Sequence, residues 1–223
     1  MRAMILAAGR GERLRPLTDT VPKPLVEVGG QPLITYHLQH LAAAGFREVV
    51  INCAWLAPLL METLGDGHRY GVKLQYSVEP EALETGGGIK KALPLLGDAP
   101  FLVINGDIFI DRLPELPQLA DNCLAHLWLV DNPPHHPEGD FVLQGQQLLA
   151  DDKPGSKLTF SGMGLYHPQL FAGIDSSRFA LGPVLRQYIS QGRVSGEHWQ
   201  DYWCDVGTVA RLQTLERRLA DKR

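Results

Sequence analysis

The sequence contains few cysteines, and they are not arranged as in most structural sites. Cys53, Cys123 and Cys204 are odd in number, widely spaced and without a CxxC pair. This pattern excludes a disulfide framework and a cysteine-based zinc site, since both need several thiols at matched spacing, so we expect three reduced thiols. His135 and His136 stand in a proline-rich turn without a third ligand at useful spacing, so we expect no metal on this pair.

Long apolar runs and a strong excess of one charge are also missing. No apolar stretch approaches the roughly 18 residues of a membrane span, and no charged segment with a long apolar core begins the chain. The net charge of -4 and the pI near 6.0 argue against a broad nucleic-acid-binding surface. We therefore expect a cytoplasmic protein that binds neither nucleic acid nor a membrane. Its oligomeric state stays open, and a monomer is compatible with the sequence.

Strand-like and helical segments alternate along the first half of the chain, which is typical of a parallel sheet built from βαβ units. We predict strands at 4–8, 49–51, 72–78 and 101–104, and helices at 33–44, 58–64 and 88–96. After about residue 113 the pattern changes to alternating runs at 127–130, 141–143 and 158–166, followed by a helix at 209–219. These later runs predict mixed or antiparallel strands. The fold class is therefore α/β, with a mixed, mostly parallel central sheet flanked by helices.

The loop after the first predicted strand carries the most specific signal. Gly9 and Gly11 let backbone amides approach phosphate oxygens without a Cβ in the way. Arg13 and Arg15 add guanidinium groups that suit phosphate. Lys23 has a proline on each side, which restricts the backbone and holds the ammonium in a defined place. The segment predicts a binding site for a nucleoside triphosphate.

Other interpretations of this loop fit less well. A glycine pair alone would favour a basic surface turn, but the added cations and the Pro-Lys-Pro element favour phosphate binding. A dinucleotide fingerprint fails because Leu14 replaces its third glycine, and because we expect no helix to begin so close to Pro16. The Gly-Lys-Ser/Thr ending of a P-loop is missing too.

The run AGRGERLRPLT from Ala8 to Thr18, followed by Pro-Lys-Pro, resembles the signature of the sugar-1-phosphate nucleotidyltransferases, G-G-x-G-x-R-L-x-P-L-T and P-K-P. Ala8 and Glu12 depart from it, at positions where relatives carry glycine and often threonine. The resemblance covers nearly the whole chain. It implies a Rossmann-like, glycosyltransferase-A-like fold in one domain, residues 1–223, without a C-terminal β-helix. Residues 1–112 would bind the nucleotide and 113–223 the sugar. The implied nucleotide contacts in this loop are Ala8, Gly9, Gly11, Glu12, Arg13 and Lys23.

Two aspartates are candidate magnesium ligands. Asp107 lies just beyond an apolar strand, where open α/β sheets present their ligand crevice, although Asn-Gly-Asp is also a common turn. Asp205 could instead cap the last helix, but Thr208 is the nearer capping candidate. Because Mg²⁺ usually takes one or two carboxylates plus phosphate oxygens and water, the pair is a plausible site. The resemblance implies that both aspartates bind Mg²⁺ and that Asn105 faces the sugar.

A glycine-rich acidic segment at 79–88 resembles the base-recognition loop of the family. The residues alone are equally compatible with an acidic turn before a helix that begins at Gly88. Glu79 could accept a hydrogen bond from uracil N3–H, or equally from guanine N1–H and its amino group, so the base stays open. The resemblance implies that Gly86 and Gly87 lie against the nucleotide.

Four further residues are candidate contacts of a sugar phosphate. Lys153 beside a proline is a reasonable phosphate contact, and Asp140 could accept two sugar hydroxyls, although each alone is more often a surface residue. Asp152 and Ser161 stand where the family has the glutamate of E-K-P and part of N-A-G. These departures leave the sugar open.

The resemblance implies attack of a sugar-1-phosphate oxygen on the α-phosphorus of a nucleoside triphosphate, giving a nucleotide sugar and pyrophosphate. Lys23 would stabilise the α-phosphate and Arg13 the leaving pyrophosphate. The runs GERLRPLTDTVPKPL and SGMGLYHP are similar to short bacterial uridylyltransferases that use UTP and N-acetylmuramic acid 1-phosphate in peptidoglycan recycling. Mannose-1-phosphate guanylyltransferase is the alternative, since it shares the pattern of residues 79–87. The second alternative is a catalytically inactive nucleotide-sugar sensor.

Overall fold

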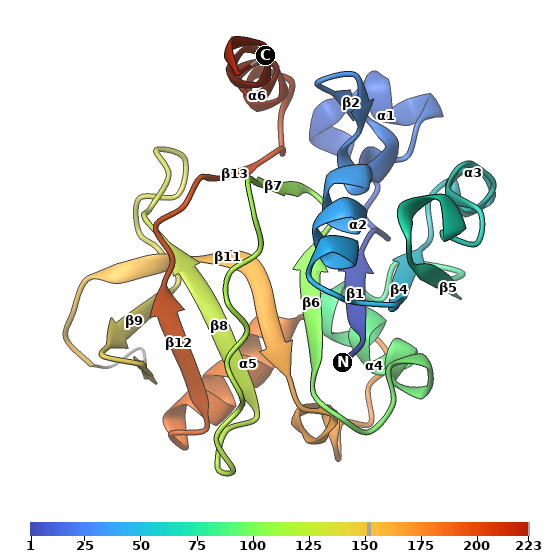
Figure 1. Ribbon diagram of the computed structural model, residues 1–223. Helices are drawn as coiled ribbons and strands as arrows, with labels where there is room; N and C mark the ends of the chain where they lie inside the picture. The colour runs from blue at the N-terminus through green and yellow to red at the C-terminus, as the bar shows by residue number, and fades with distance from the viewer. Residues whose placement is uncertain (151–152, 223) are drawn as a thin grey trace.

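The computed structural model describes residues 1–150 and 153–222. Its centre is a nine-stranded mixed sheet (Figure 1). In spatial order the strands are β5 (Lys73–Val78), β4 (Glu48–Cys53), β1 (Ala3–Leu6), β6 (Phe101–Asn105), β11 (Lys157–Tyr166), β8 (Ala125–Val130), β12 (Val194–His198), β10 (Gln147–Leu149) and β9 (Phe141–Gln144). The first four strands of this order are parallel, whereas β11 is antiparallel to β6 and β8. The predicted change of strand pattern in the second half is confirmed.

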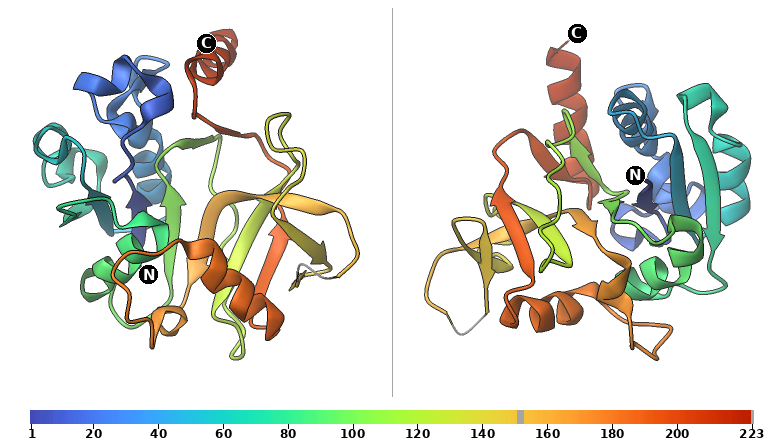
Figure 2. Two further views of the ribbon diagram at one scale, coloured as in Figure 1. Left: turned by 180° about the vertical axis from the view of Figure 1, so that it is seen from behind. Right: turned by 60° about the horizontal axis from the view of Figure 1, so that its bottom comes forward.

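Helices cover both faces of the sheet, which explains the continuous apolar runs in its central strands. One face packs against α2 (Leu33–Ala43) and α3 (Ala57–Leu64), and the other against α4 (Glu84–Leu96) and α5 (Leu181–Ser190) (Figure 2). Alternate residues of β8 enter opposite cores: Trp128 joins the first, and Leu127 and Leu129 the second. Because side chains on both faces of β8 enter a core, the strand is buried throughout, including the polar His126.

A third core attaches the C-terminal helix α6 (Val209–Asp221) to the N-terminal part of the chain. Leu212 and Leu215 pack with Val28, in β2 (Glu27–Val28), and with Phe109. Figure 1 shows α6 beside this N-terminal segment, far from it in sequence. The side chain of Thr208 accepts a hydrogen bond from the backbone of Arg211, so the predicted cap is confirmed. Among the described residues, no helix has the length and apolar character needed to cross a membrane.

Two local expectations about helix starts are wrong. Helix α4 begins at Glu84 and not at Gly88, because the segment before it is tied down by a hydrogen bond from Leu83 N to the Glu79 carboxylate. A short helix, α1 (Leu17–Thr20), begins directly after Pro16. Proline is tolerated at a helix start because the N–H it lacks has no partner in the first turn.

The arrangement of strands brings three loops together at one edge of the sheet. Leu6 at the end of β1 is in register with Asn52 in β4 and with Asn105 in β6. The loop after β6 leads into β7 (Ile108–Ile110), which pairs with β13 (Trp203–Asp205) near the C-terminus. Segments from the whole length of the chain therefore meet at the carboxyl ends of the parallel strands, where α/β sheets bind ligands.

Candidate active site

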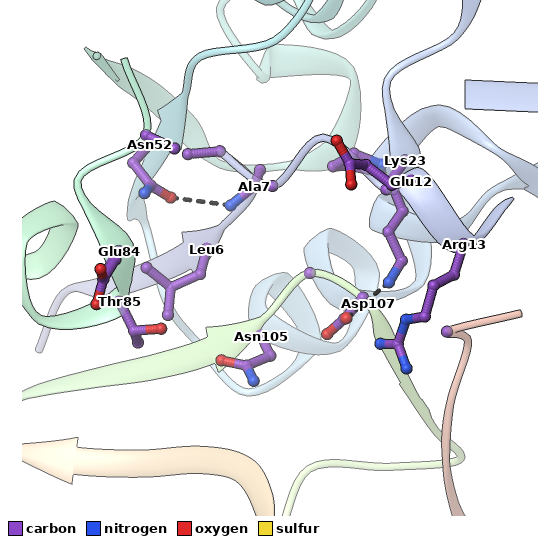
Figure 3. A pocket seen from close by; sticks show the side chains of 17 residues that line it. Leu6, Ala7, Glu12, Arg13, Lys23, Asn52, Glu84, Thr85, Asn105 and Asp107 are labelled. Atoms are coloured by element: carbon purple, nitrogen blue, oxygen red, sulfur yellow. Dashed lines mark hydrogen bonds and ion pairs between the residues drawn. The ribbon is translucent and has the colours of Figure 1, made fainter. Parts of the chain in front are cut away.

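A cavity of about 450 Å³ lies at this edge of the sheet (Figure 3). The glycine loop after β1, the loop after β6 and the start of α4 form its walls. Its lining residues are Leu6, Ala7, Ala8, Gly9, Gly11, Glu12, Arg13, Lys23, Pro24, Asn52, Ala82, Glu84, Thr85, Asn105, Gly106, Asp107 and Gly207. All six nucleotide contacts proposed in the N-terminal segment are among them.

The glycine loop owes its shape to a residue with positive φ. Gly11 has φ of +69°, and a Cβ at this position would lie 2.9 Å from the Thr18 side chain and 3.1 Å from Lys23. The Thr18 hydroxyl donates a hydrogen bond of 2.7 Å to the Gly11 carbonyl and closes the turn. A Cβ at Gly9, by contrast, would meet no atom within 4 Å. Gly11 therefore shapes the loop, while Gly9 leaves its backbone open to the cavity.

Lys23 and Asp107 form an ion pair at the cavity wall. The Lys23 ammonium lies 2.7 Å from Asp107 Oδ2 (Figure 3). The lysine is in a short 3₁₀ turn, Lys23–Leu25, and its side chain is 11% exposed. Burial of the methylene stem aims the ammonium into the cavity. The Arg13 side chain also points from the glycine loop toward this ion pair (Figure 3).

A second cavity of about 360 Å³ continues from the first. It shares Arg13, Asn105 and Asp107 with the first cavity, so the two are contiguous. Its lining residues are Arg13, Asn105, Asp107, Ile108, Pro133, His135, His136, Thr159, Phe160, Ser161, Gly162, Trp203 and Asp205. Most of its wall comes from the second half of the chain.

Pairing of two short strands brings Asp205 to Asp107. Residue Asp205 of β13 is in register with Ile108 of β7, and Val206 N donates a 2.7 Å hydrogen bond to Asp107 O. The Asp205 carboxylate lies 2.7 Å from Nη1 of Arg211 and 3.1 Å from Nε2 of His135. Each of the two candidate magnesium ligands therefore has a cationic or imidazole partner in the protein.

The donor set fits Mg²⁺ only in part. Two carboxylates, from the turn after β6 and from β13, reach one cavity, and oxygen is the ligand this ion prefers. Within residues 1–150 and 153–222, however, no group of three or more His, Cys, Asp or Glu side chains could hold a metal. The remaining ligands would have to be water and phosphate oxygens, as is usual for Mg²⁺. Asp107 and Asp205 are therefore compatible with a metal that binds together with a phosphate substrate.

Glu79 is buried beneath the cavity and does not line it. Its Oε1 accepts a hydrogen bond of 2.7 Å from the Asn52 amide, and its Oε2 accepts one of 2.9 Å from Leu83 N. The Asn52 Oδ1 in turn accepts a 2.9 Å hydrogen bond from Ala7 N. Glu79 is 2% exposed, whereas Asn52 reaches the cavity wall. This chain of bonds ties the base loop to the glycine loop.

Asn52 is a candidate site residue that our sequence interpretation missed. The available signal was a polar residue near the end of a strand whose preceding residues, from Val49 to Ile51, are apolar.

The glycines of the base loop are in contact with the protein itself. A Cβ at Gly86 would collide with the ring of Phe179, and one at Gly87 with the carbonyl of Ser177. Neither glycine is among the described residues that line the two cavities. From this segment, Glu84 and Thr85 line the first cavity instead. Close packing against the segment before α5 thus explains Gly86 and Gly87 without a nucleotide.

The structure separates the four predicted sugar contacts. Ser161 is fully buried, lines the second cavity and accepts a hydrogen bond from Met163 N through its hydroxyl. Asp140 and Lys153 are outside the described cavity linings. Asp140 Oδ2 accepts a 2.8 Å hydrogen bond from Phe160 N. Asp152 lies outside the described residues.

Two buried groups near the site stay uncharged. Burial lowers the pKa of His37 to about 4, so its ring is neutral and Nε2 donates to Ile108 O at 2.9 Å. This bond supports the segment that follows Asp107. Burial raises the pKa of Cys53 to about 11, with Glu79 adding to the shift. The Cys53 thiol is therefore protonated and unreactive at neutral pH.

The comparisons with known proteins agree with this geometry. Residues 2–141 match a family model described as Nucleotidyl transferase. The chain is 53% identical to N-acetylmuramate alpha-1-phosphate uridylyltransferase of Neisseria meningitidis serogroup B, over 97% of both chains. It is 34% identical to the protein of the same name from Caulobacter vibrioides, over 98% of this chain and 97% of that one. A mannose-1-phosphate guanyltransferase of Yarrowia lipolytica is 44% identical over 93% of this chain, but this match covers 61% of that protein.

A solved structure of similar fold is a putative glucose-1-phosphate thymidylyltransferase from Bacillus anthracis. The TM-score is 0.84 at 21% identity, and the match covers 99% of this chain and 96% of that one. The predicted α/β fold of this class is confirmed.

Proposed function

Since this chain belongs to the nucleotidyl transferase family, we propose that it transfers a uridylyl group from UTP to N-acetylmuramic acid 1-phosphate. The products are the UDP-sugar and pyrophosphate. The observation that carries the proposal is the meeting of the glycine loop, Lys23 and Asp107 at one cavity that opens into a second. A phosphate-binding surface is thereby joined to a space for a second substrate.

The two cavities support an assignment of the two halves of the chain. Apart from Gly207, the first cavity is formed by residues before position 112, and we assign this part to the nucleotide. The second cavity draws most of its wall from residues after 112, and we assign it to the sugar 1-phosphate. Three residues line both cavities, as expected for groups near the reacting phosphates: Arg13, Asn105 and Asp107.

Positioning and charge neutralisation carry such a transfer, because little covalent chemistry is left to the protein. The sugar-phosphate oxygen attacks the α-phosphorus and pyrophosphate leaves in line with it. Lys23 would stabilise the charge on the α-phosphate, and Arg13 that on the leaving pyrophosphate. Asp107 and Asp205 would hold Mg²⁺, which neutralises phosphate charge when bound.

Support for uridine as the base comes from the two similar uridylyltransferases. The buried pair of Asn52 and Glu79 does not identify the base, because Glu79 does not line the cavity and both of its carboxylate oxygens accept hydrogen bonds from the protein. The guanyltransferase similarity makes GTP with mannose 1-phosphate the second candidate. We further propose a cytoplasmic role in peptidoglycan recycling, since N-acetylmuramic acid is a peptidoglycan sugar.

The test is pyrophosphate release with Mg²⁺ over a grid of nucleotides and sugars. UTP, GTP, CTP and dTTP are each combined with the 1-phosphates of N-acetylmuramic acid, N-acetylglucosamine, glucose and mannose. We expect turnover with UTP and the muramic sugar. Turnover confined to GTP with mannose 1-phosphate would establish the second candidate, and no turnover in any combination would establish a binding protein without this activity.

A further inference from the structure

The proposed sugar substrate carries a second anionic group in addition to its phosphate. N-acetylmuramic acid differs from N-acetylglucosamine by a lactyl ether on O3, which ends in a carboxylate. The described side chains of the second cavity that can carry positive charge are Arg13, His135 and His136. Arg13 also lines the nucleotide cavity, so it belongs to the phosphate end. The two histidines remain as candidate partners for the carboxylate.

His135 is already engaged with the candidate metal site. Its Nε2 lies 3.1 Å from Asp205 Oδ1 and also contacts the Arg211 guanidinium. Asp205 lines the same cavity, so a ligand carboxylate at this ring would stand beside it and be repelled. His135 is therefore a poor partner for the lactyl group.

His136 is oriented differently. Its Nε2 lies 3.1 Å from Asp140 Oδ1, and Asp140 Oδ2 is fixed by a 2.8 Å hydrogen bond from Phe160 N in β11. Among the described cavity linings, the second includes His136 but neither includes Asp140, so the histidine and not the aspartate borders this space. The other ring nitrogen, Nδ1, makes no hydrogen bond within the described part of the chain. A protonated ring would offer this nitrogen as a charged donor.

The loop that carries His136 does not need this side chain to keep its shape. The Asn132 amide donates hydrogen bonds to Pro137 O at 3.0 Å and to Lys157 O at 2.9 Å. The Thr159 hydroxyl donates another, of 2.8 Å, to Asn132 Oδ1. These three hydrogen bonds hold the loop, so its shape does not depend on the contact between His136 and Asp140.

We propose that His136, held by Asp140, binds the lactyl carboxylate and makes the enzyme prefer N-acetylmuramic acid 1-phosphate to N-acetylglucosamine 1-phosphate. This inference rests on the proposed function, because it assigns a residue to one part of the proposed substrate. Asp140 acts as a positioning residue here and not as the contact for sugar hydroxyls that its sequence context suggests.

The experiment measures kcat/KM for both sugars with saturating UTP and Mg²⁺. We expect His136→Ala to lower the value for the muramic sugar about 10-fold or more through KM, the usual loss for a charged hydrogen bond. The value for N-acetylglucosamine 1-phosphate should change less than about 2-fold, since this sugar has no lactyl carboxylate for His136 to bind. His136→Lys, which offers a charged donor at this position, should retain part of the preference. The matched control is His68→Ala, an exposed histidine in neither described cavity lining, which should change neither sugar.

Calorimetric binding of each sugar phosphate to the wild type and to His136→Ala separates this inference from the proposed function. A His136-dependent binding preference without pyrophosphate release would refute the function and keep the inference. If the enzyme turns over the muramic sugar and His136→Ala keeps the same preference between the two sugars, the function stands and the inference is refuted. An equal loss for both sugars would assign His136 a general structural role and overturn the inference.

Discussion

The Lys23 ammonium lies 2.7 Å from Asp107 Oδ2, across 84 positions of sequence. In the same way, Arg211 holds Asp205 at 2.7 Å. Both candidate metal ligands are therefore paired with protein cations. A triphosphate that attracts the cations would release the carboxylates for Mg²⁺, so the two ligands should favour each other's binding.

Replacement of Lys23 by Ala should reduce catalysis more than nucleotide binding. Its charge is needed most when negative charge develops on the transferred phosphate, so we expect kcat to fall by about 10²- to 10³-fold. The dissociation constant of UTP should rise less than about 10-fold. Steady-state kinetics and calorimetry measure the two quantities, and equal losses in both would contradict this role.

The same substitution should strengthen metal binding to the nucleotide-free protein. Without the ammonium, Asp107 keeps its full charge for a cation, and we expect the affinity for Mn²⁺ to rise at least about 3-fold. Electron paramagnetic resonance of Mn²⁺ gives the affinity without any turnover. Asp107→Asn is the control and should weaken binding. An unchanged affinity in Lys23→Ala would show that Lys23 leaves Asp107 readily.

Asn52 should be essential for the stability of the site. Asn52→Ala leaves Ala7 N and Glu79 Oε1 without their partners, and we expect a loss of about 1–3 kcal/mol in the free energy of unfolding. Asn52→Asp should be worse, because it sets two carboxylates against each other. Adding Glu79→Gln to Asn52→Asp restores one donor and one acceptor and should recover much of the loss. Urea denaturation measures all three variants, and a missing recovery would reject the hydrogen-bond pattern.

Two glycines should respond in opposite ways to the same change. Gly87→Ala places a Cβ against the backbone carbonyl of Ser177, and we expect a destabilisation of about 1–3 kcal/mol. Gly9→Ala meets no protein atom within 4 Å, so its stability should change by less than about 0.5 kcal/mol. The new methyl group of Gly9→Ala lies at the cavity wall and should weaken UTP binding. Thermal unfolding and calorimetry distinguish the two effects, and a stable Gly87→Ala protein would reject the packing explanation.

Stability should fall in mild acid because of His37. Its folded pKa of about 4 is below the ordinary value of 6.5, so the unfolded chain takes up the proton first. Stability is therefore complete above about pH 6.5 and decreases as the pH falls toward about 4. Between about pH 7.5 and 5 this residue should account for about 2 kcal/mol. Urea unfolding of His37→Gln, which can still donate to Ile108 O, should show a smaller decrease by this amount; an identical decrease would exclude His37 as the cause.

Local patterns in the sequence were sufficient to predict the regular elements. Apolar runs with flanking glycines placed the parallel strands and the helices at 33–44 and 209–219 within a few residues of their observed bounds. The glycine loop could be recognised for the same reason, because its geometry depends on neighbouring residues. Gly11 accepts a hydrogen bond from Thr18, and a Cβ at Gly11 would meet Lys23, both in the same short segment.

Tertiary structure decided which polar residues face the cavities. Glu79 looked like a base contact but is buried against Asn52, which lies 27 positions away and was missed. Gly86 packs against Phe179, and Asp140 accepts a hydrogen bond from Phe160 N in β11. The sequence by itself determined the elements and the phosphate loop, since short-range sterics and apolar periodicity specify both. The use of each carboxylate depended on its partners, and the fold brings those partners in from distant segments.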